Sequence, residues 1–194
     1  MNKKGFTLME ILVVIAIIAV LISIAIPVFH SSLKKTANAT DAANARNLYA
    51  VLATMVNMGE IELPEKSTDP NDLQGVWVLV CRDSTTTPNS YGRLNGTMFC
   101  GANSTVSVNG VRSRSWNTEN TALRKAIIEQ VGNLKVQSRG GNDGWDWYLA
   151  GYCVDTKGNV SGYMYSGMAG QRSDVAHAAL QGTSNLQKLI QNGK

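Results

Sequence analysis

A long apolar segment near the N-terminus, preceded by a single carboxylate, constrains this chain more than any other feature. Residues 11–28 are almost entirely apolar, and Glu10 stands directly before them. About 18 such residues lie near the lower limit for crossing a hydrocarbon core of roughly 30 Å, and residues 6–9 add length. An ionised carboxylate at the edge of this segment is costly unless it has a partner. Glu10 is therefore predicted to be a functional residue.

A secretory signal peptide is one interpretation of this segment, with residues 23–25 as a loose small-residue cleavage site. Against it, Glu10 interrupts the passage from basic to apolar residues, and an amphipathic pattern continues beyond the apolar run. We therefore expect the segment to remain in the mature protein. Lys3 and Lys4 favour a cytoplasmic N-terminus, which sends the C-terminal part of the chain outside.

Residues 5–10, Gly-Phe-Thr-Leu-Met-Glu, resemble the N-terminus of the type IV pilin superfamily, as does the long apolar helix with Pro27 inside it. The resemblance is close over about residues 1–58 and covers the remainder only in outline. It implies that a prepilin peptidase cuts between Gly5 and Phe6 and methylates the new amino terminus of Phe6. It also implies that Glu10 pairs with the terminal amine of Phe6 on a neighbouring subunit, which would supply the missing partner by assembly.

The predicted domain organisation has three parts. Residues 1–5 are a leader peptide, 6–58 form one long helix, and 59–194 form a globular head. Within the helix, 6–29 are the membrane or filament-core part and 30–58 are amphipathic, with an apolar face that docks on the head. That face comprises Leu48, Val51, Leu52, Met55 and Val56. Pro27 removes one backbone donor and should loosen the helix, either as a tolerated membrane kink or for filament packing.

The head is predicted to be one modest domain with an antiparallel sheet, which gives an α+β fold of the type IV pilin kind. Residues 75–81 form a buried β-branched strand, and 145–154 and 160–165 form a hairpin around a glycine-containing turn. Residues 118–131 have helical spacing, with Asn117 or Thr118 as a cap. The tail at 173–191 is predicted to form two short helices broken at Gly182.

Three cysteines, Cys81, Cys100 and Cys153, fall in the exported head, where a disulfide can persist. Three residues allow one bridge and one remaining thiol. Spacing leaves all three pairings open, and so does the alternative of three buried thiols. We favour a pair that includes Cys100.

The composition gives little support for catalysis or for tight nucleic-acid binding. The formal charge is +4, and loss of Lys3 and Lys4 with the leader leaves 16 basic and 14 acidic side chains. Two cations and an aromatic ring lie close together in the sequence at Arg112, Arg114 and Trp116, which makes DNA a weak candidate ligand. A ligand on a host surface is a second weak candidate. The sequence has only two histidines, no phosphate-binding loop, and no nucleophile and base at a spacing typical of a catalytic pair. We therefore expect that the protein is not an enzyme and has no catalytic residue, metal or cofactor.

The predicted function is that of a structural subunit of an extracellular type IV pilus that serves adhesion or motility. Its partners would be copies of itself in a helical filament, the membrane before assembly and the prepilin peptidase, and the resemblance implies an assembly platform with an ATPase motor. The subunit would be a single-pass protein of the cytoplasmic membrane before it joins a filament on the cell surface. The alternatives are a minor pilin or pseudopilin of a secretion or DNA-uptake system, a membrane-anchored sugar- or DNA-binding module that does not polymerise, and a secreted soluble protein.

Overall fold

The computed structural model describes residues 5–68, 74–83, 96–113, 118–168 and 185–192. The chain divides into two compact units, Met1–Thr36 and Ala37–Lys194. The helix α1, Leu8–Asn57, contributes to both. Antiparallel sheets follow it, so the predicted α+β fold with a long N-terminal helix is confirmed.

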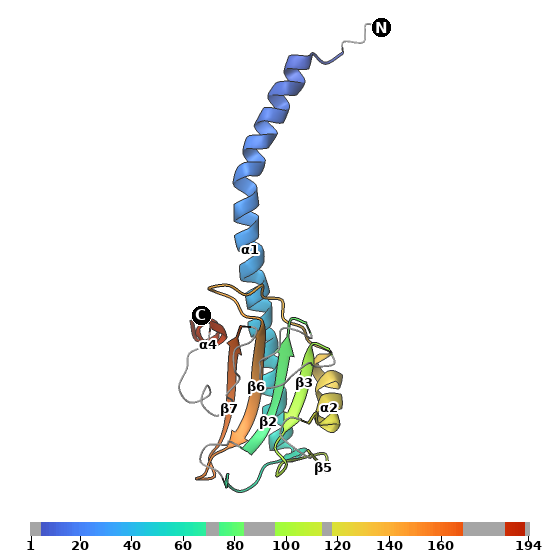
Figure 1. Ribbon diagram of the computed structural model, residues 1–194, viewed down its shortest axis with the longest axis vertical. Helices are drawn as coiled ribbons and strands as arrows, with labels where there is room; N and C mark the ends of the chain where they lie inside the picture. Colours follow the sequence, from blue (N-terminus) through green and yellow to red (C-terminus); the bar gives the residue numbers. More distant parts are fainter. Residues whose placement is uncertain (1–4, 69–73, 84–95, 114–117, 169–184, 193–194) are drawn as a thin grey trace. The chain divides into compact units, whose positions relative to one another are not determined.

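The second unit is built on a four-stranded antiparallel sheet with the order β3-β2-β6-β7. Its strands are β2 (Gln74–Cys81), β3 (Met98–Ala102), β6 (Trp147–Val154) and β7 (Val160–Gly167). The helix α2, Thr121–Val131, lies at the β3 side, and α4, Asn185–Asn192, lies at the β7 side (Figure 1). The strands predicted at 75–81, 145–154 and 160–165 are therefore present, whereas β3 was not predicted.

A smaller sheet of order β1-β4-β5 was also missed, although its hairpin has a clear sequence signal. It consists of β1 (Ile61–Glu62), β4 (Ser107–Val108) and β5 (Val111–Arg112). The connection between the last two is Asn109-Gly110, and both residues have positive φ, at 48° and 77°. Asn-Gly with two such angles is the preferred two-residue hairpin turn.

The helix at 121–131 begins later than expected because another residue caps it. The side chain of Asn120 accepts a hydrogen bond from the Leu123 N–H at 2.9 Å, so Asn120 is the N-cap rather than Asn117 or Thr118. At the other end, Gly132 follows Val131 with a φ of 75° and donates its N–H to the Ile128 carbonyl. In the tail, α4 is described from Asn185 onward, and the helix predicted before Gly182 lies outside the described residues.

One stripe of α1 is buried in the second unit, and it includes two polar residues that periodicity did not single out. The buried residues are Asn38, Asp41, Ala42, Ala45, Leu48, Leu52 and Met55. The apolar members pack on the sheet face that presents Val76, Val78 and Val80, together with Leu123 and Ile127 of α2. The predicted docking face is thus present, and Val51 and Val56 are half-buried at its edge.

The carboxylate of Asp41 is fully buried and accepts three N–H groups from one loop. The donors are the backbone N–H of Gln137 at 2.8 Å, the backbone N–H of Ser138 at 2.9 Å and the indole N–H of Trp145 at 3.0 Å. Burial raises the pKa of the Asp41 carboxyl above its ordinary value, and these donors oppose that rise. The same loop is tied to α1 by the Asn38 amide, which donates to the Asp143 carbonyl at 2.7 Å.

Aromatic rings cover three of the glycines in the large sheet. In the strand register Gly101 lies opposite Trp77, Gly151 opposite Tyr163, and Gly167 opposite Trp147. A Cβ atom on any of the three would collide with the ring of its partner. The rings therefore occupy space that only glycine leaves free, a known way of stabilising glycine within a sheet.

We predict that Asp41→Asn destabilises the protein by about 2 to 4 kcal/mol, because an amide presents its own NH2 group to N–H donors that need an acceptor. Thermal unfolding of the full chain in detergent measures the effect. Glu62→Gln, at an exposed position on β1, is the control and should leave the midpoint unchanged. Equal midpoints for Asp41→Asn and the parent chain would contradict the role given to this carboxylate.

We predict that Gly101→Ala lowers stability by about 1 to 3 kcal/mol through overpacking, because the added methyl group meets the Trp77 indole. The double variant Gly101→Ala, Trp77→Leu should lose less stability than the sum of the two single variants, since the smaller side chain relieves the collision. Additive losses in denaturant unfolding would show that the two positions do not interact.

Candidate functional site: the N-terminal segment and the cysteines

The N-terminal segment begins with three residues that lie outside the helix. Gly5, Phe6 and Thr7 precede α1 without regular secondary structure, and Phe6 is 85% exposed. A Cβ atom on Gly5 would meet nothing within 4 Å, and its φ is not in the positive region. The fold itself therefore does not require glycine at position 5, and the peptide bond between Gly5 and Phe6 lies in an uncovered stretch of chain.

Glu10 has a partner within its own chain that the sequence analysis missed. Its Oε2 accepts hydrogen bonds from the Thr7 N–H at 2.8 Å and the Thr7 hydroxyl at 2.9 Å, and the Thr7 Oγ1 accepts the Glu10 N–H at 3.2 Å. This reciprocal arrangement is a capping box, and the Thr-x-x-Glu spacing before an apolar run is its signal. It satisfies donors at the start of α1 and leaves Glu10 Oε1 unbonded among the described residues.

Beyond Glu10 the large apolar side chains of the first unit are exposed. Their exposed fractions run from 47% at Val13 and Ile18 to 68% at Phe29. By length and composition α1 is able to cross a membrane. Pro27 lies inside α1 without ending it, and nearby the Ser23 hydroxyl donates to the Val20 carbonyl at 2.7 Å. Residues 11–29 of the first unit therefore present a large exposed apolar surface, which is unfavourable in water.

The N-terminal segment matches a known family motif. Residues 1–26 match the prokaryotic N-terminal methylation motif. No curated protein and no solved structure matches the chain. The matched motif is the class III signal of a prepilin, which fits anchoring in the membrane before assembly. It supports membership of the type IV pilin superfamily and points to a structural subunit.

The three cysteines are buried free thiols, and the sheet explains why no two of them are joined. Cys100 pairs with Val78 in the register and lies on the face that packs against α1 and α2. Cys81 and Cys153 lie on the opposite face. Cys153 is opposite Gly75, six positions from Cys81 along β2, which is roughly 20 Å at about 3.3 Å per residue. A disulfide needs Cα atoms about 4.4 to 6.8 Å apart.

The favoured pairing through Cys100 therefore has no suitable geometry in this sheet, and the open alternative of three buried thiols matches the structure. Burial raises the pKa of Cys81 and of Cys100 to about 12 and also raises the pKa of Cys153. Since the thiolate is the reactive form, these thiols are inert at neutral pH.

Of the three residues predicted to make a DNA-binding cluster, the structure describes Arg112 alone. Arg112 is exposed on β5, while Arg114 and Trp116 lie outside the described residues. Across the described ranges, no group of three or more His, Cys, Asp and Glu side chains is placed to hold a metal ion. In the hairpin turn, the Asp155 carboxylate instead accepts the N–H groups of Lys157 and Asn159.

We predict that all three thiols resist alkylation in the folded protein at neutral pH and that all three react after denaturation without reductant. Intact mass before and after denaturation counts the added groups. Because Cys81 and Cys100 keep their protons up to about pH 12 when folded but only to about 9.0 when unfolded, stability should also fall as pH rises above 9. A single reactive thiol after denaturation would demonstrate a bridge.

Proposed function

We propose that this protein is a structural subunit of an extracellular type IV pilus that serves adhesion or motility. One observation carries the proposal. The segment that matches the methylation motif, residues 1–26, runs into a helix whose apolar N-terminal part is entirely exposed. Such a surface needs lipid around it before assembly and the same helix of other subunits afterwards. Residues 1–5 are proposed as the leader, 6–58 as the long helix, and 59–194 as the head.

In this proposal, assembly proceeds in two steps, processing of the N-terminus followed by charge pairing between subunits. A prepilin peptidase cuts between Gly5 and Phe6, and Phe6 receives the methyl group at its new amine. That amine then binds Glu10 of a neighbouring subunit, where Oε1 is unbonded. Lipid is already apolar, so transfer of the helix from lipid to filament gains little from water exclusion, and directional pairing must set the register. An assembly platform and an ATPase motor supply the work.

Pro27 is proposed as a second assembly position. Because proline lacks an N–H, the carbonyl four residues before it has no intrahelical partner. That carbonyl belongs to Ser23, whose hydroxyl donates instead to the Val20 carbonyl. This local weakness lets the helix adjust as neighbours pack around it.

Substitutions at Glu10 separate the capping role from the pairing role. Glu10→Gln keeps the capping box, which accepts Glu or Gln, but removes the charge. We expect Glu10→Gln, Glu10→Ala and Glu10→Leu all to insert in the membrane and to reduce the filament yield by a factor of about one hundred or more, because an unpaired buried amine costs about 3 to 5 kcal/mol. Sheared filament and membrane fractions are compared by immunoblot. Normal yield from Glu10→Gln would show that capping, not charge, is the role of Glu10.

The proposed function is tested by shearing cells, pelleting the surface filaments and measuring the intact mass of this protein in the pellet. A mass that begins at Phe6 with one added methyl group is the expected result. A soluble form in the medium that starts near Ile26, with none in the pellet, would instead support the secreted protein. Correct processing with only monomeric membrane protein that binds sugar or DNA would support the binding module.

A further inference from the structure

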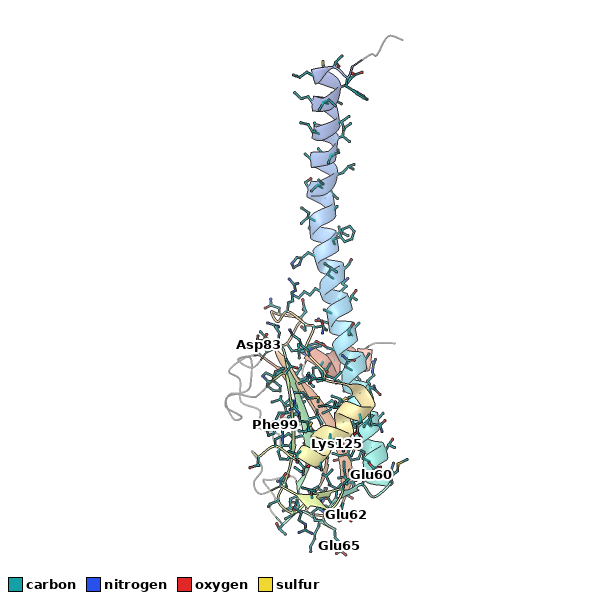
Figure 2. The ribbon with its side chains drawn as sticks, turned by 90° about the vertical axis from the view of Figure 1, so that its right-hand side faces the viewer. Glu60, Glu62, Glu65, Asp83, Phe99 and Lys125 are labelled. Atoms are coloured by element: carbon teal, nitrogen blue, oxygen red, sulfur yellow. The ribbon has the colours of Figure 1, made fainter. Side chains whose placement is uncertain are left out.

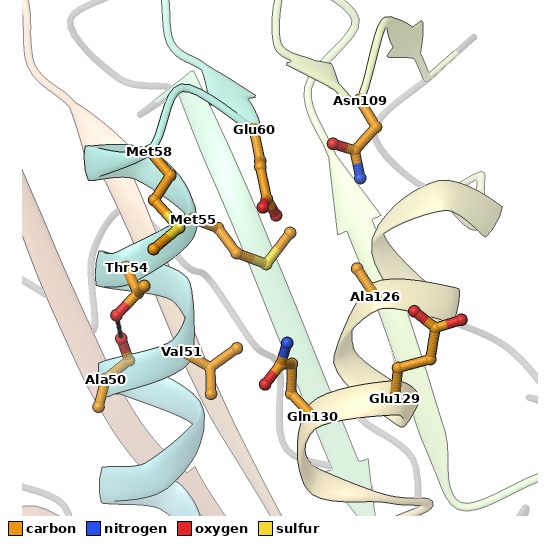
Figure 3. A pocket seen from close by; sticks show the side chains of 10 residues that line it. All are labelled: Ala50, Val51, Thr54, Met55, Met58, Glu60, Asn109, Ala126, Glu129 and Gln130. Atoms are coloured by element: carbon orange, nitrogen blue, oxygen red, sulfur yellow. Dashed lines mark hydrogen bonds between the residues drawn. The ribbon is translucent and has the colours of Figure 1, made fainter.

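A groove lies on the second unit between the C-terminal part of α1, the helix α2 and the turn between β4 and β5 (Figure 3). Its volume is about 510 Å³. This is within the range of sites that bind small molecules or short segments of protein. The lining residues are Ala50, Val51, Thr54, Met55, Met58, Glu60, Asn109, Ala126, Glu129 and Gln130.

The floor of the groove is apolar and adaptable. Val51 and Met55 come from α1, Ala126 comes from α2, and Met58 is 71% exposed at the end of the helix (Figure 3). Methionine side chains are flexible and polarisable, so they fit partners of irregular shape. An exposed methionine over such a floor favours contact with another apolar side chain.

The charge in the groove is negative and is not compensated locally. Glu60 and Glu129 are exposed, and each lies near the C-terminal end of a helix, where the helix dipole is also negative. Neither helix has a basic residue in its last turn. Lys125 lies one turn before Glu129 on α2, but no ion pair joins them, and Lys before Glu is the less favourable order. A cationic partner would relieve both unfavourable placements.

The chain carries a segment with the opposite properties. Phe29 and Leu33, four residues apart on one side of α1, are 68% and 67% exposed although they follow the end of the apolar run. At about 100° per residue, Lys34 and Lys35 lie roughly 120° and 140° around the helix from the middle of this apolar pair, one in each direction. Their long side chains can extend around the helix toward anionic groups. Neither lysine makes a salt bridge within the described residues.

We propose that the groove binds residues Phe29–Lys35 of α1 from a second copy of this chain. The apolar pair Phe29 and Leu33 then covers Met55 and Met58, and the two lysines approach Glu60 and Glu129. A helix that places an apolar face in a groove, with charged side chains reaching complementary charges at its rim, is a common mode of recognition between helices and proteins. This inference rests on the proposed function, because it names the surface on which one subunit receives the next.

The first test is photocrosslinking from the groove in living cells. Met58 is replaced by p-benzoylphenylalanine, which its high exposure allows, and crosslinked products from the sheared filaments are mapped by mass spectrometry. A dimer joined to residues 29–35 of the second copy is the expected result. Filaments that form while the crosslink maps to another segment or another protein would overturn this inference and leave the proposed function standing. Absence of filaments from cells that express the unsubstituted chain would remove the proposed function and this inference with it.

The second test is a charge exchange. We expect Glu60→Lys with Glu129→Lys to lower the yield of crosslinked dimer about tenfold, and Lys34→Glu with Lys35→Glu to do the same. Combining the four changes should restore the yield, because the charges are again complementary. The control is Glu62→Lys with Glu65→Lys, at exposed positions that follow Glu60 along the chain and do not line the groove (Figure 2). Failure of the combined variant to recover, or equal loss in the control, would overturn the proposal.

Discussion

The buried carboxylate of Asp41 is the interaction on which the second unit depends. It lies in the stripe of α1 that faces the sheet, and its three N–H donors belong to the loop that leads into β6. Arg82 binds that loop from the end of β2, through the carbonyls of Ser138 and Trp145 and through Asp146. Apolar packing is tolerant of small shifts, whereas a carboxylate with three directed donors is not. Asp41 therefore sets the position of α1 along the sheet.

The helix α1 presents two surfaces of different kinds, and this division connects structure with function. From Ala37 onward a narrow stripe is buried in the second unit, while the apolar side chains of the first unit are exposed. Exposure on this scale is compatible with lipid or with other helices but not with water. The capping box at Thr7 and Glu10 orders the start of α1 in the single subunit. In the proposed assembly, the amine of a neighbouring subunit would meet a preformed helix end at which one oxygen of Glu10 has no hydrogen bond among the described residues.

Local patterns in the sequence predicted several elements correctly. The strands β2, β6 and β7 were found because β-branched and aromatic runs with a glycine turn are local signals. The capping box and the Asn109-Gly110 hairpin carried equally local signals and were overlooked. The role of Asp41 had no such signal. In the sequence alone, an aspartate in a helix is expected to be exposed, and its burial depends on hydrogen-bond donors from a distant loop. The strand β3 was missed because a five-residue run with two small residues is ambiguous.

The sequence by itself determined the N-terminal processing motif, the membrane-length helix and the α+β class, because each depends on residues adjacent along the chain. Only the tertiary structure decided the pairing register of the sheet. That register places glycines opposite Trp77, Tyr163 and Trp147 and separates the cysteines between two faces. The tertiary structure also creates the groove, because its lining residues come from both α1 and α2. The physical reason is that the elements paired with a strand or packed on it decide which of its faces is buried and which residues lie opposite each other. Those elements lie far away in sequence.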